Sequence, residues 1–326
     1  MDRVFITGAS SGVGPALARR YPASGATLGL LGRREDALRE LADSLPGQHR
    51  CYAVDVRDRQ ALHAAAQDFI AFCQGRVDVV IASAGISAGT LTGHHEDYEV
   101  FKAIVDTNLL ATVATFEPFV EPMRATGGGR LVGIASVAGV RGLPGAGAYS
   151  ASKSAVVTYC ESLRLELAGD GIRVVTIAPG YIKTAMTAHN PYKMPFLMDA
   201  DKFAQRAHAA IGRGTSYTVI PWQMGVVAKL MRLLPNAVYD RLARNAPRKP
   251  RKADKAGCAG DHAAAGVGGR GGRRPGAGRH GTTSSPTSVA TWPTSPQCST
   301  SHWRPRTPTR LMLTFSSAAS RGAFSG

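Results

Sequence analysis

Tyr149 and Lys153 lie four residues apart, and Ser136 precedes Tyr149 by thirteen positions. On a helix, residues i and i+4 share one face, so the phenol and the ammonium would lie in the same local field. A free tyrosine has a pKa near ~10, and a neighbouring cation favours the phenolate and lowers that pKa. A serine hydroxyl can donate to a substrate oxygen. These three residue types together suit proton transfer to or from a carbonyl or alcohol oxygen.

A tyrosine and a lysine at this spacing are common on helices, and the start of the chain is what favours a catalytic interpretation. The apolar run Val4–Ile6 predicts a buried strand, and Thr7–Gly14 follows with the pattern T-G-x-x-x-G-x-G. Glycines permit a tight turn and a close approach of the backbone to a ligand. A helix predicted from Pro15 to about Ala23 would offer free N–H groups to a pyrophosphate. The spacing differs from G-x-G-x-x-G, the fingerprint of dinucleotide-binding sites. The alternative is therefore that these glycines only make a tight connection between the strand and the helix.

From about Arg3 to about Pro247 the chain resembles the short-chain dehydrogenase/reductase family. The matching motifs, in order, are Thr7-Gly8-Ala9-Ser10-Ser11-Gly12-Val13-Gly14, Asp55-Val56, Ala84-Gly85, the set Asn108, Ser136, Tyr149 and Lys153, and Pro179-Gly180-Tyr181-Ile182-Lys183-Thr184. One departure stands out: Ala82-Ser83 occupies the place of two asparagines in the family. We expect Ser83 to replace only part of the hydrogen bonding of those asparagines.

The resemblance implies a role for each member of the catalytic set. Tyr149 is expected to be the general acid in reduction, and Ser136 is expected to hold the substrate oxygen. Lys153 is expected to lower the pKa of Tyr149 and to bind the nicotinamide ribose. Asn108 is expected to fix a water that links Lys153 to solvent. The resemblance assigns cofactor binding to Gly8, Ser10, Ser11, Gly12, Val13, Gly14, Arg33, Arg34, Asp55, Val56, Ala84, Gly85, Tyr149, Lys153, Pro179, Gly180, Ile182 and Thr184.

The residues after the second predicted strand, Thr27–Leu31, indicate which nicotinamide cofactor is bound. In NAD sites an acidic residue at this point binds the ribose 2′-OH, whereas an arginine accommodates the 2′-phosphate of NADP. Gly32 occupies the acidic position, and Arg33 and Arg34 follow it. Because a guanidinium matches phosphate geometry, we expect NADP(H) rather than NAD(H). A solvated loop that happens to hold two arginines is the alternative.

Strand and helix patterns alternate along the chain as far as about residue 220. Further strands are predicted over Val77–Ala82, Arg130–Ala135 and Ile172–Ala178, and helices over Arg59–Phe72, Tyr98–Met123 and Ala148–Ala168. Hydrophobic residues make up 44% of the chain, which is enough for a sizeable core. The alternation predicts an α/β fold with a doubly wound parallel sheet, a Rossmann fold, in a single domain over residues 1–247.

Residues 248–326 are predicted to form a basic, low-complexity, disordered tail. Gly, Pro, Ser and Thr supply 37 of the 70 residues from Gly257 to Gly326, so little apolar area could be buried to offset ordering entropy. Residues 1–246 carry a net charge of +5 and residues 247–326 carry +11, so the basic character belongs to the tail. A shifted reading frame of a GC-rich gene would give this composition.

The tail also allows a nucleic-acid-binding interpretation. Its run Gly268–Arg274 resembles RGG-type segments, and Trp292 and Trp303 could stack on bases. This alternative rests on the tail alone, and we expect no specific nucleic-acid partner for the domain.

The cysteine pattern and the chain start favour a cytoplasmic protein without a metal site. The five cysteines form no C-x-x-C pair and their number is odd, which indicates a reducing compartment without zinc. The first strand begins so early that no room is expected for a signal peptide. No run of 18 apolar residues is present, so no transmembrane helix is expected.

Two further segments are predicted to shape the substrate site and the surface. Ala185–Asp199 is a predicted lid whose apolar side chains favour a lipophilic substrate, or alternatively pack as a lid core: Met186, Tyr192, Met194, Phe196, Leu197 and Met198. Ile220–Arg244 has apolar residues at helical spacing with basic residues between them. Packing against the body or a second subunit is one interpretation, and peripheral membrane contact is the other.

The sequence therefore predicts an NADP(H)-dependent oxidoreductase that transfers hydride between nicotinamide and a carbonyl or secondary alcohol of a small molecule. The resemblance also implies a homodimer or homotetramer. A non-catalytic NADP-binding sensor or scaffold is the alternative, because a fold alone does not prove activity. The complete Asn-Ser-Tyr-Lys set argues against that alternative.

Overall fold

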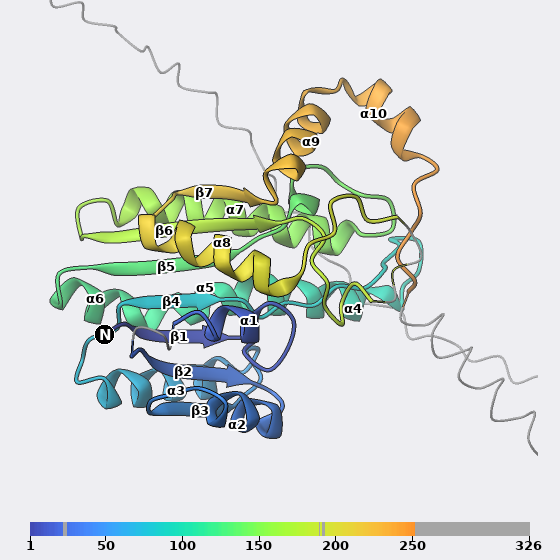
Figure 1. The fold of residues 1–326 in the computed structure, drawn as a ribbon. Helices are drawn as coiled ribbons and strands as arrows, with labels where there is room; N and C mark the ends of the chain where they lie inside the picture. Colours follow the sequence, from blue (N-terminus) through green and yellow to red (C-terminus); the bar gives the residue numbers. More distant parts are fainter. Residues whose placement is uncertain (22–24, 189, 191–192, 252–326) are drawn as a thin grey trace, which may run out of the picture. The chain divides into compact units, whose positions relative to one another are not determined.

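The computed structural model describes residues 1–21, 25–188, 190 and 193–251. Its strands form one parallel sheet in the order β3-β2-β1-β4-β5-β6-β7 (Figure 1). The strands are β1 (Arg3–Thr7), β2 (Thr27–Gly32), β3 (His49–Ala53), β4 (Val79–Ala82), β5 (Gly129–Ile134), β6 (Ile172–Pro179) and β7 (Tyr217–Ile220). The strand order reverses between β1 and β4, which is where ligands bind in sheets of this kind.

The central strands are buried on both faces, which explains their continuous apolar runs. Val4, Phe5 and Ile6 of β1 are all fully buried. Phe5 packs on one face with its ring centroid 5.5 Å from that of Phe69 and 5.0 Å from that of Phe119. Val4 and Ile6 point to the opposite face and join a second core. The sheet therefore separates two hydrophobic cores.

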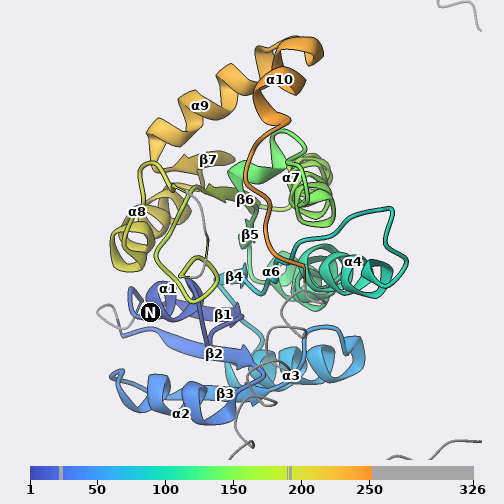
Figure 2. The ribbon, with the colours of Figure 1, turned by 90° about the vertical axis from the view of Figure 1, so that its right-hand side faces the viewer.

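Helices cover both faces of the sheet, which confirms the doubly wound α/β fold (Figure 2). On one face lie α1 (Gly14–Ala18), α2 (Glu35–Asp43) and α8 (Ala200–Arg213). On the other face lie α3 (Arg59–Phe72), α4 (Asp97–Val105), α5 (Ala111–Phe116), α6 (Val120–Ala125) and α7 (Gly147–Glu166). The predicted helix over Arg59–Phe72 has the observed bounds, and Asp58 caps it by accepting from the Ala61 N–H.

The single helix predicted over Tyr98–Met123 is interrupted twice. A π-helical turn, η2 (Asp106–Leu110), separates α4 from α5, and a 3-10 turn, η3 (Glu117–Phe119), separates α5 from α6. Pro118 lies in the second break, where a residue without an N–H interrupts the helical hydrogen bonds. The first helix is also shorter than predicted, because α1 ends at Ala18. The short strands β3 and β7 were not among the predicted elements.

After β7 the chain forms α9 (Trp222–Leu233) and α10 (Asn236–Ala243), then returns along the domain to Arg251 (Figure 2). The last described residues, Arg248–Arg251, contact the body: the Gly89 N–H donates to the Pro250 carbonyl over 3.2 Å. The predicted tail beyond Arg251 lies outside the described residues. The boundary between residues 247 and 248 stays a prediction.

Candidate active site

The carboxyl ends of the parallel strands bring most of the predicted site together at one edge of the sheet. Residues far apart in the sequence thereby meet because each follows a strand. The segments there are Gly8–Gly14 after β1, Gly32–Arg34 at the end of β2, Asp55-Val56 after β3, Ala84-Gly85 after β4, Ser136 after β5 and Pro179–Thr184 at the end of β6.

The glycine turn after β1 requires glycine for two different reasons. Gly8 and Gly12 have φ angles of +71° and +69°, in the region that side chains disfavour. Gly14 is crowded, because a Cβ there would lie 2.2 Å from the Gly8 carbonyl oxygen. A Cβ on Gly8 would lie 2.8 Å from the Ala84 backbone. The turn therefore lies in close contact with the segment after β4. That it binds the pyrophosphate of a dinucleotide stays a prediction.

Replacing Gly14 with alanine should weaken binding of the nicotinamide cofactor by about tenfold or more and lower Tm, because the backbone must move to admit the methyl group. Fluorescence titration of NADPH and thermal unfolding measure the two effects. Gly147→Ala is the matched control, since a Cβ at this first residue of α7 meets nothing within 4 Å. If Gly14→Ala binds NADPH as tightly as the control, the turn does not hold the cofactor.

The residues after β2 and β3 form a cluster of arginines around one carboxylate. The Asp55 carboxylate accepts a hydrogen bond from the Arg57 guanidinium over 2.7 Å. This guanidinium holds the pKa of the Asp55 carboxyl below its usual range, and the charge of Arg33 adds a smaller lowering. Arg34 donates to the Ser10 carbonyl in the glycine turn. The sequence analysis did not identify Arg57 as a partner of Asp55, although a basic residue two positions after an aspartate could have indicated this ion pair.

The departure at Ala82-Ser83 has a visible consequence. The Ser83 hydroxyl oxygen is buried and has no hydrogen-bond partner among the described residues. Ser83 was expected to replace part of the hydrogen bonding of the family's two asparagines, and the structure does not show such a bond at its hydroxyl. The backbone two residues beyond Ala84 is instead held by Asn108, whose Oδ1 accepts from the Ile86 N–H over 2.8 Å.

Asn108 lies in the π-helical turn, a feature that often marks functional positions. Its side-chain Nδ2 donates to the Ile86 carbonyl over 3.1 Å and to the Ser152 hydroxyl over 3.0 Å. The side chain therefore joins the segment after β4 to α7. Thr112 donates to the main-chain carbonyl of Asn108 over 2.9 Å. The role of Asn108 in fixing a water stays a prediction.

Ser136 and the Tyr149–Lys153 face of α7 are held together by close backbone packing. The 3-10 turn η4 (Val137–Gly139) begins after Ser136, whose hydroxyl accepts from the Ala138 N–H over 3.2 Å. A Cβ on Gly139 would lie 2.8 Å from the Lys153 backbone carbonyl carbon, so this glycine lets η4 lie directly on α7. The buried Lys153 ammonium donates to the Ile134 carbonyl at the end of β5 over 2.7 Å.

Burial controls the protonation of this pair. It raises the pKa of Tyr149, and the hydrogen bond with Ser136 acts in the opposite direction. Burial also lowers the pKa of Lys153 to about 8. The predicted lowering of the tyrosine pKa by Lys153 is not found in this state. The physical reason is that desolvation of the phenolate dominates, while the ammonium is directed to the end of β5.

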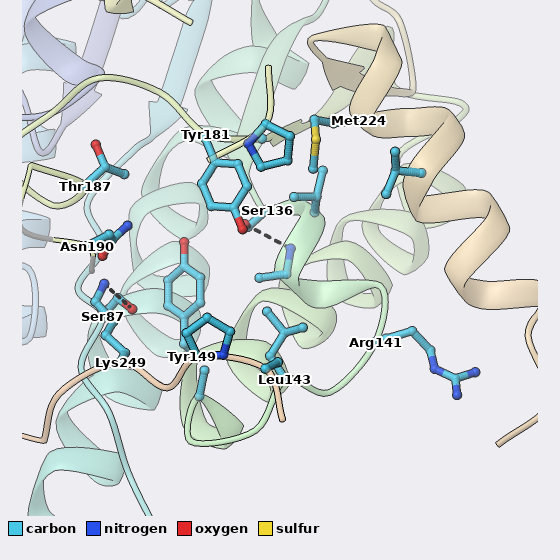
Figure 3. Close-up of a pocket in the computed structure, with 18 of the residues that line it drawn as sticks. Ser87, Ser136, Arg141, Leu143, Tyr149, Tyr181, Thr187, Asn190, Met224 and Lys249 are labelled. Carbon is cyan, nitrogen blue, oxygen red and sulfur yellow. Dashed lines mark hydrogen bonds between the residues drawn. The ribbon is translucent and has the colours of Figure 1, made fainter. Parts of the chain in front are cut away.

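A mostly apolar cavity of about 610 Å³ has Ser136 and Tyr149 on its wall (Figure 3). The wall also includes uncharged polar residues, Ser87, Tyr181, Thr187 and Asn190, and apolar residues such as Leu143, Met186, Met224, Val227 and Met231. The contribution of α9, with Met224, Val227 and Met231, was missed, because nothing in the local sequence shows that this helix folds back over the site.

The predicted lid lines the cavity, but mostly through residues other than the predicted apolar ones. Met186 lines it, whereas Met194, Phe196 and Met198 are not among the lining residues, and Tyr192 lies outside the described residues. Met198 instead pairs through its backbone with the strand-like segment at Ile182. The apolar side chains of this loop are thus divided: Met186 lines the cavity, Met198 packs against the second core, and Phe196 and Leu197 are exposed.

The segment after β6 lies against α9. The Gly180 N–H donates to the Ile220 carbonyl over 2.8 Å, and a Cβ on Gly180 would lie 2.7 Å from Met224 Cγ. Thr184 is held by its N–H donating to the Thr187 hydroxyl over 3.0 Å. This packing joins the expected nicotinamide side of the site to the cavity wall.

The helix α9 packs on the body through Met224 and Ala228 and exposes an apolar stripe on its other side. Trp222, Leu230 and Leu233 are 60% or more exposed. Packing against the body is therefore confirmed, whereas membrane or subunit contact stays a prediction. Within the described part of the chain, no helix is long and apolar enough to cross a membrane.

Comparisons with known proteins agree with this geometry. A family model described as short chain dehydrogenase matches residues 2–194. An uncharacterized oxidoreductase of Myxococcus xanthus is 37% identical over 243 residues, 74% of this chain and 95% of that protein. A 2-dehydro-3-deoxy-L-rhamnonate dehydrogenase (NAD(+)) of Sphingomonas is 36% identical over 187 residues, 57% of this chain and 74% of that protein.

A solved structure shares the fold as well. The 3-ketoacyl-ACP reductase of Sinorhizobium meliloti superposes with a TM-score of 0.63 at 28% identity, covering 69% of this chain and 99% of that one. The parallel sheet, the glycine turn and the family match together show an oxidoreductase that uses a nicotinamide cofactor on carbonyl or alcohol groups. The chain belongs to the short-chain dehydrogenase/reductase family.

Proposed function

We propose that this protein is an NADP(H)-dependent reductase or dehydrogenase for a lipophilic carbonyl or secondary alcohol. The observation that carries the proposal is a cavity in which Ser136 and Tyr149 face a mostly apolar wall. An apolar cavity with a few polar groups at one point favours a substrate with an apolar body and one reacting oxygen.

The proposed chemistry assigns one task to each side chain. The Tyr149 phenol is protonated at neutral pH, and burial raises its pKa further; the protonated phenol is the form that donates a proton to a carbonyl oxygen during reduction. The Ser136 hydroxyl holds the same oxygen. In this proposal Lys153 stabilises negative charge that develops on the phenol during turnover, a role for which its ammonium must turn from the Ile134 carbonyl that it contacts in this structure. When bound, the nicotinamide supplies or accepts the hydride.

NADPH oxidation with a panel of aliphatic and aromatic ketones and aldehydes tests this function, with the alcohol product identified by mass spectrometry. We expect turnover of apolar carbonyls that is lost when the cofactor is omitted. Tight NADPH binding without turnover of any carbonyl or alcohol would favour the non-catalytic cofactor sensor instead.

The preference for NADP(H) is proposed from the arginines after β2. Arg34 already reaches the glycine turn, and Arg33 lies close enough to lower the pKa of Asp55. Removing both as Arg33→Ala with Arg34→Ala should raise KM for NADPH by about 10- to 100-fold and leave KM for NADH nearly unchanged, since charge-assisted hydrogen bonds contribute about 1.5–3 kcal/mol.

Steady-state kinetics with each cofactor check this result, and Arg206→Ala on the exposed side of α8 is the control. A double variant that still prefers NADPH as strongly as wild type contradicts the assignment. Introducing an acid at Gly32 is a less clean test, because a Cβ there would lie 2.7 Å from the Ser10 hydroxyl oxygen.

We also propose a homodimer or homotetramer. Tyr98 and Leu110, around α4, are exposed apolar residues of the kind that an interface covers. Size-exclusion chromatography with light scattering on the full chain tests this, and a monomer at micromolar concentration would contradict it.

A further inference from the structure

The cavity wall carries positive charge that the proposed chemistry does not use. Arg141, Lys193 and Lys249 line it, and none of the described lining residues is acidic. A charge on the wall of a mostly apolar cavity that is shielded from water acts through a lower dielectric, so it attracts an anionic group more strongly than a surface charge does.

The three cations differ in how they are held. Arg141 donates to the Leu234 carbonyl over 3.3 Å and to Asn236 Oδ1 over 3.2 Å, and its guanidinium lies 4.1 Å from the Tyr239 ring centroid. It therefore stabilises the connection between α9 and α10. Lys193 is exposed on the loop after β6.

Lys249 is the cation fixed beside the reacting groups. Its ammonium donates to the Ser87 hydroxyl over 3.0 Å, and both residues line the cavity with Tyr149. Figure 3 shows Lys249 and Ser87 on one side of the Tyr149 ring and Arg141 on the other.

A segment that we call the strap, residues 246–251, sets the position of Lys249. Its end is anchored by Arg251, which pairs with Asp97 over 2.8 Å and with Glu96 over 2.7 Å. A Cβ on Gly89 would lie 2.1 Å from the Lys249 carbonyl oxygen, so this glycine lets the strap lie directly on the body. Ala246, Pro247 and Lys249 of the strap form part of the cavity wall.

We propose that the cavity selects substrates that carry an anionic oxygen group, such as a carboxylate, on an apolar body, and that Lys249 binds this group. The statement that such a compound is also reduced or oxidised rests on the proposed function. An ammonium acts as a point charge with three rotatable donors, so it can bind a carboxylate while it keeps other hydrogen-bond partners.

Calorimetric titration of the full chain with decanoate and with decanamide tests the proposal without turnover, because these two probes differ mainly in charge. We expect wild type to bind decanoate about tenfold more tightly or better, with a difference that shrinks as salt is added. Lys249→Met should abolish the preference, Lys249→Arg should retain it, and Lys249→Glu should reverse it.

Two further variants separate a local effect from a general one. Lys229→Met removes the same charge from the exposed side of α9 and should leave the preference unchanged. Arg251→Ala should reduce the preference, because the strap loses its anchor while Lys249 is still present. Thermal unfolding of every variant confirms that each one is folded.

Equal affinity of wild type for the two probes, no measurable binding of either, or a preference that survives in Lys249→Met would overturn the inference. A decanoate preference in a protein that turns over no carbonyl or alcohol would instead contradict the proposed function and leave this inference intact. Turnover of neutral ketones by a protein that binds decanoate and decanamide equally would support the proposed function and contradict this inference.

Discussion

Tyr149→Phe should reduce turnover by about 10²-fold or more while NADPH affinity and Tm stay close to wild type. The substitution deletes the hydroxyl that we propose as proton donor and keeps the ring that packs beside Ser136. Positioned general acids typically contribute about 10²- to 10⁴-fold to rate. The measurements are kcat with a carbonyl from the panel, a fluorescence titration of NADPH and a thermal melt.

Tyr159→Phe is the matched control for this variant. Tyr159 lies on the same helix with its ring 6.4 Å from that of Phe116, and it does not line the cavity. This control should keep most of the wild-type rate. A Tyr149→Phe enzyme that retains more than a few per cent of wild-type turnover would exclude Tyr149 as the acid.

Lys153→Met should also abolish turnover, yet it should make the protein slightly more stable at pH 7. Burial lowers the pKa of Lys153 from 10.5 to about 8, which corresponds to a penalty of about 3 kcal/mol for the charged form. Methionine removes this penalty but leaves the Ile134 carbonyl without its donor, at a cost of about 2 kcal/mol. Because the removed penalty is larger than the cost of the lost donor, the variant should be slightly more stable than wild type at pH 7.

The sign of this difference should change with pH. Between about pH 8 and 10.5 the unfolded wild-type chain binds more protons at Lys153 than the folded one, so wild-type stability rises with pH in that window. Below pH 8 the penalty is fully present, and above 10.5 it is absent. Urea unfolding at pH 7 and pH 10 should therefore show the variant more stable at the lower pH and less stable at the higher one.

Two outcomes would contradict the account of Lys153. One is a variant that is several kcal/mol less stable than wild type at pH 7, which would mean that the ammonium stabilises the folded state. The other is a stability difference independent of pH. Retained turnover would separately remove Lys153 from the catalytic proposal.

The sequence by itself determined the elements whose signals are local. The apolar runs at Val4–Ile6 and Ile172–Ala178 are strands because both faces of the sheet are covered. The glycines of the turn after β1 were recognisable because left-handed φ angles and backbone contact leave few other choices. The alternation of such elements also determined the doubly wound fold, and the order of the motifs determined the family.

Tertiary structure alone decided what surrounds the reacting oxygen. Local periodicity showed that α9 is a helix with an apolar side, but only the packed fold showed that Met224 and Met231 face the cavity while Leu230 faces solvent. Spacing placed Tyr149 and Lys153 on one face, but the direction of the Tyr149 pKa depends on how deeply α7 is buried.

The position of Lys249 is the clearest case of a feature that the sequence alone could not predict. Nothing near it in the sequence indicates a cavity residue, because its place depends on an ion pair between Arg251 and Asp97, 154 positions apart, and on the space left by Gly89. Contacts between distant segments have no local pattern from which they could be predicted. The class of the reaction was therefore encoded locally, whereas the shape and charge of the cavity depend on the packing of distant segments, the returning C-terminal segment among them.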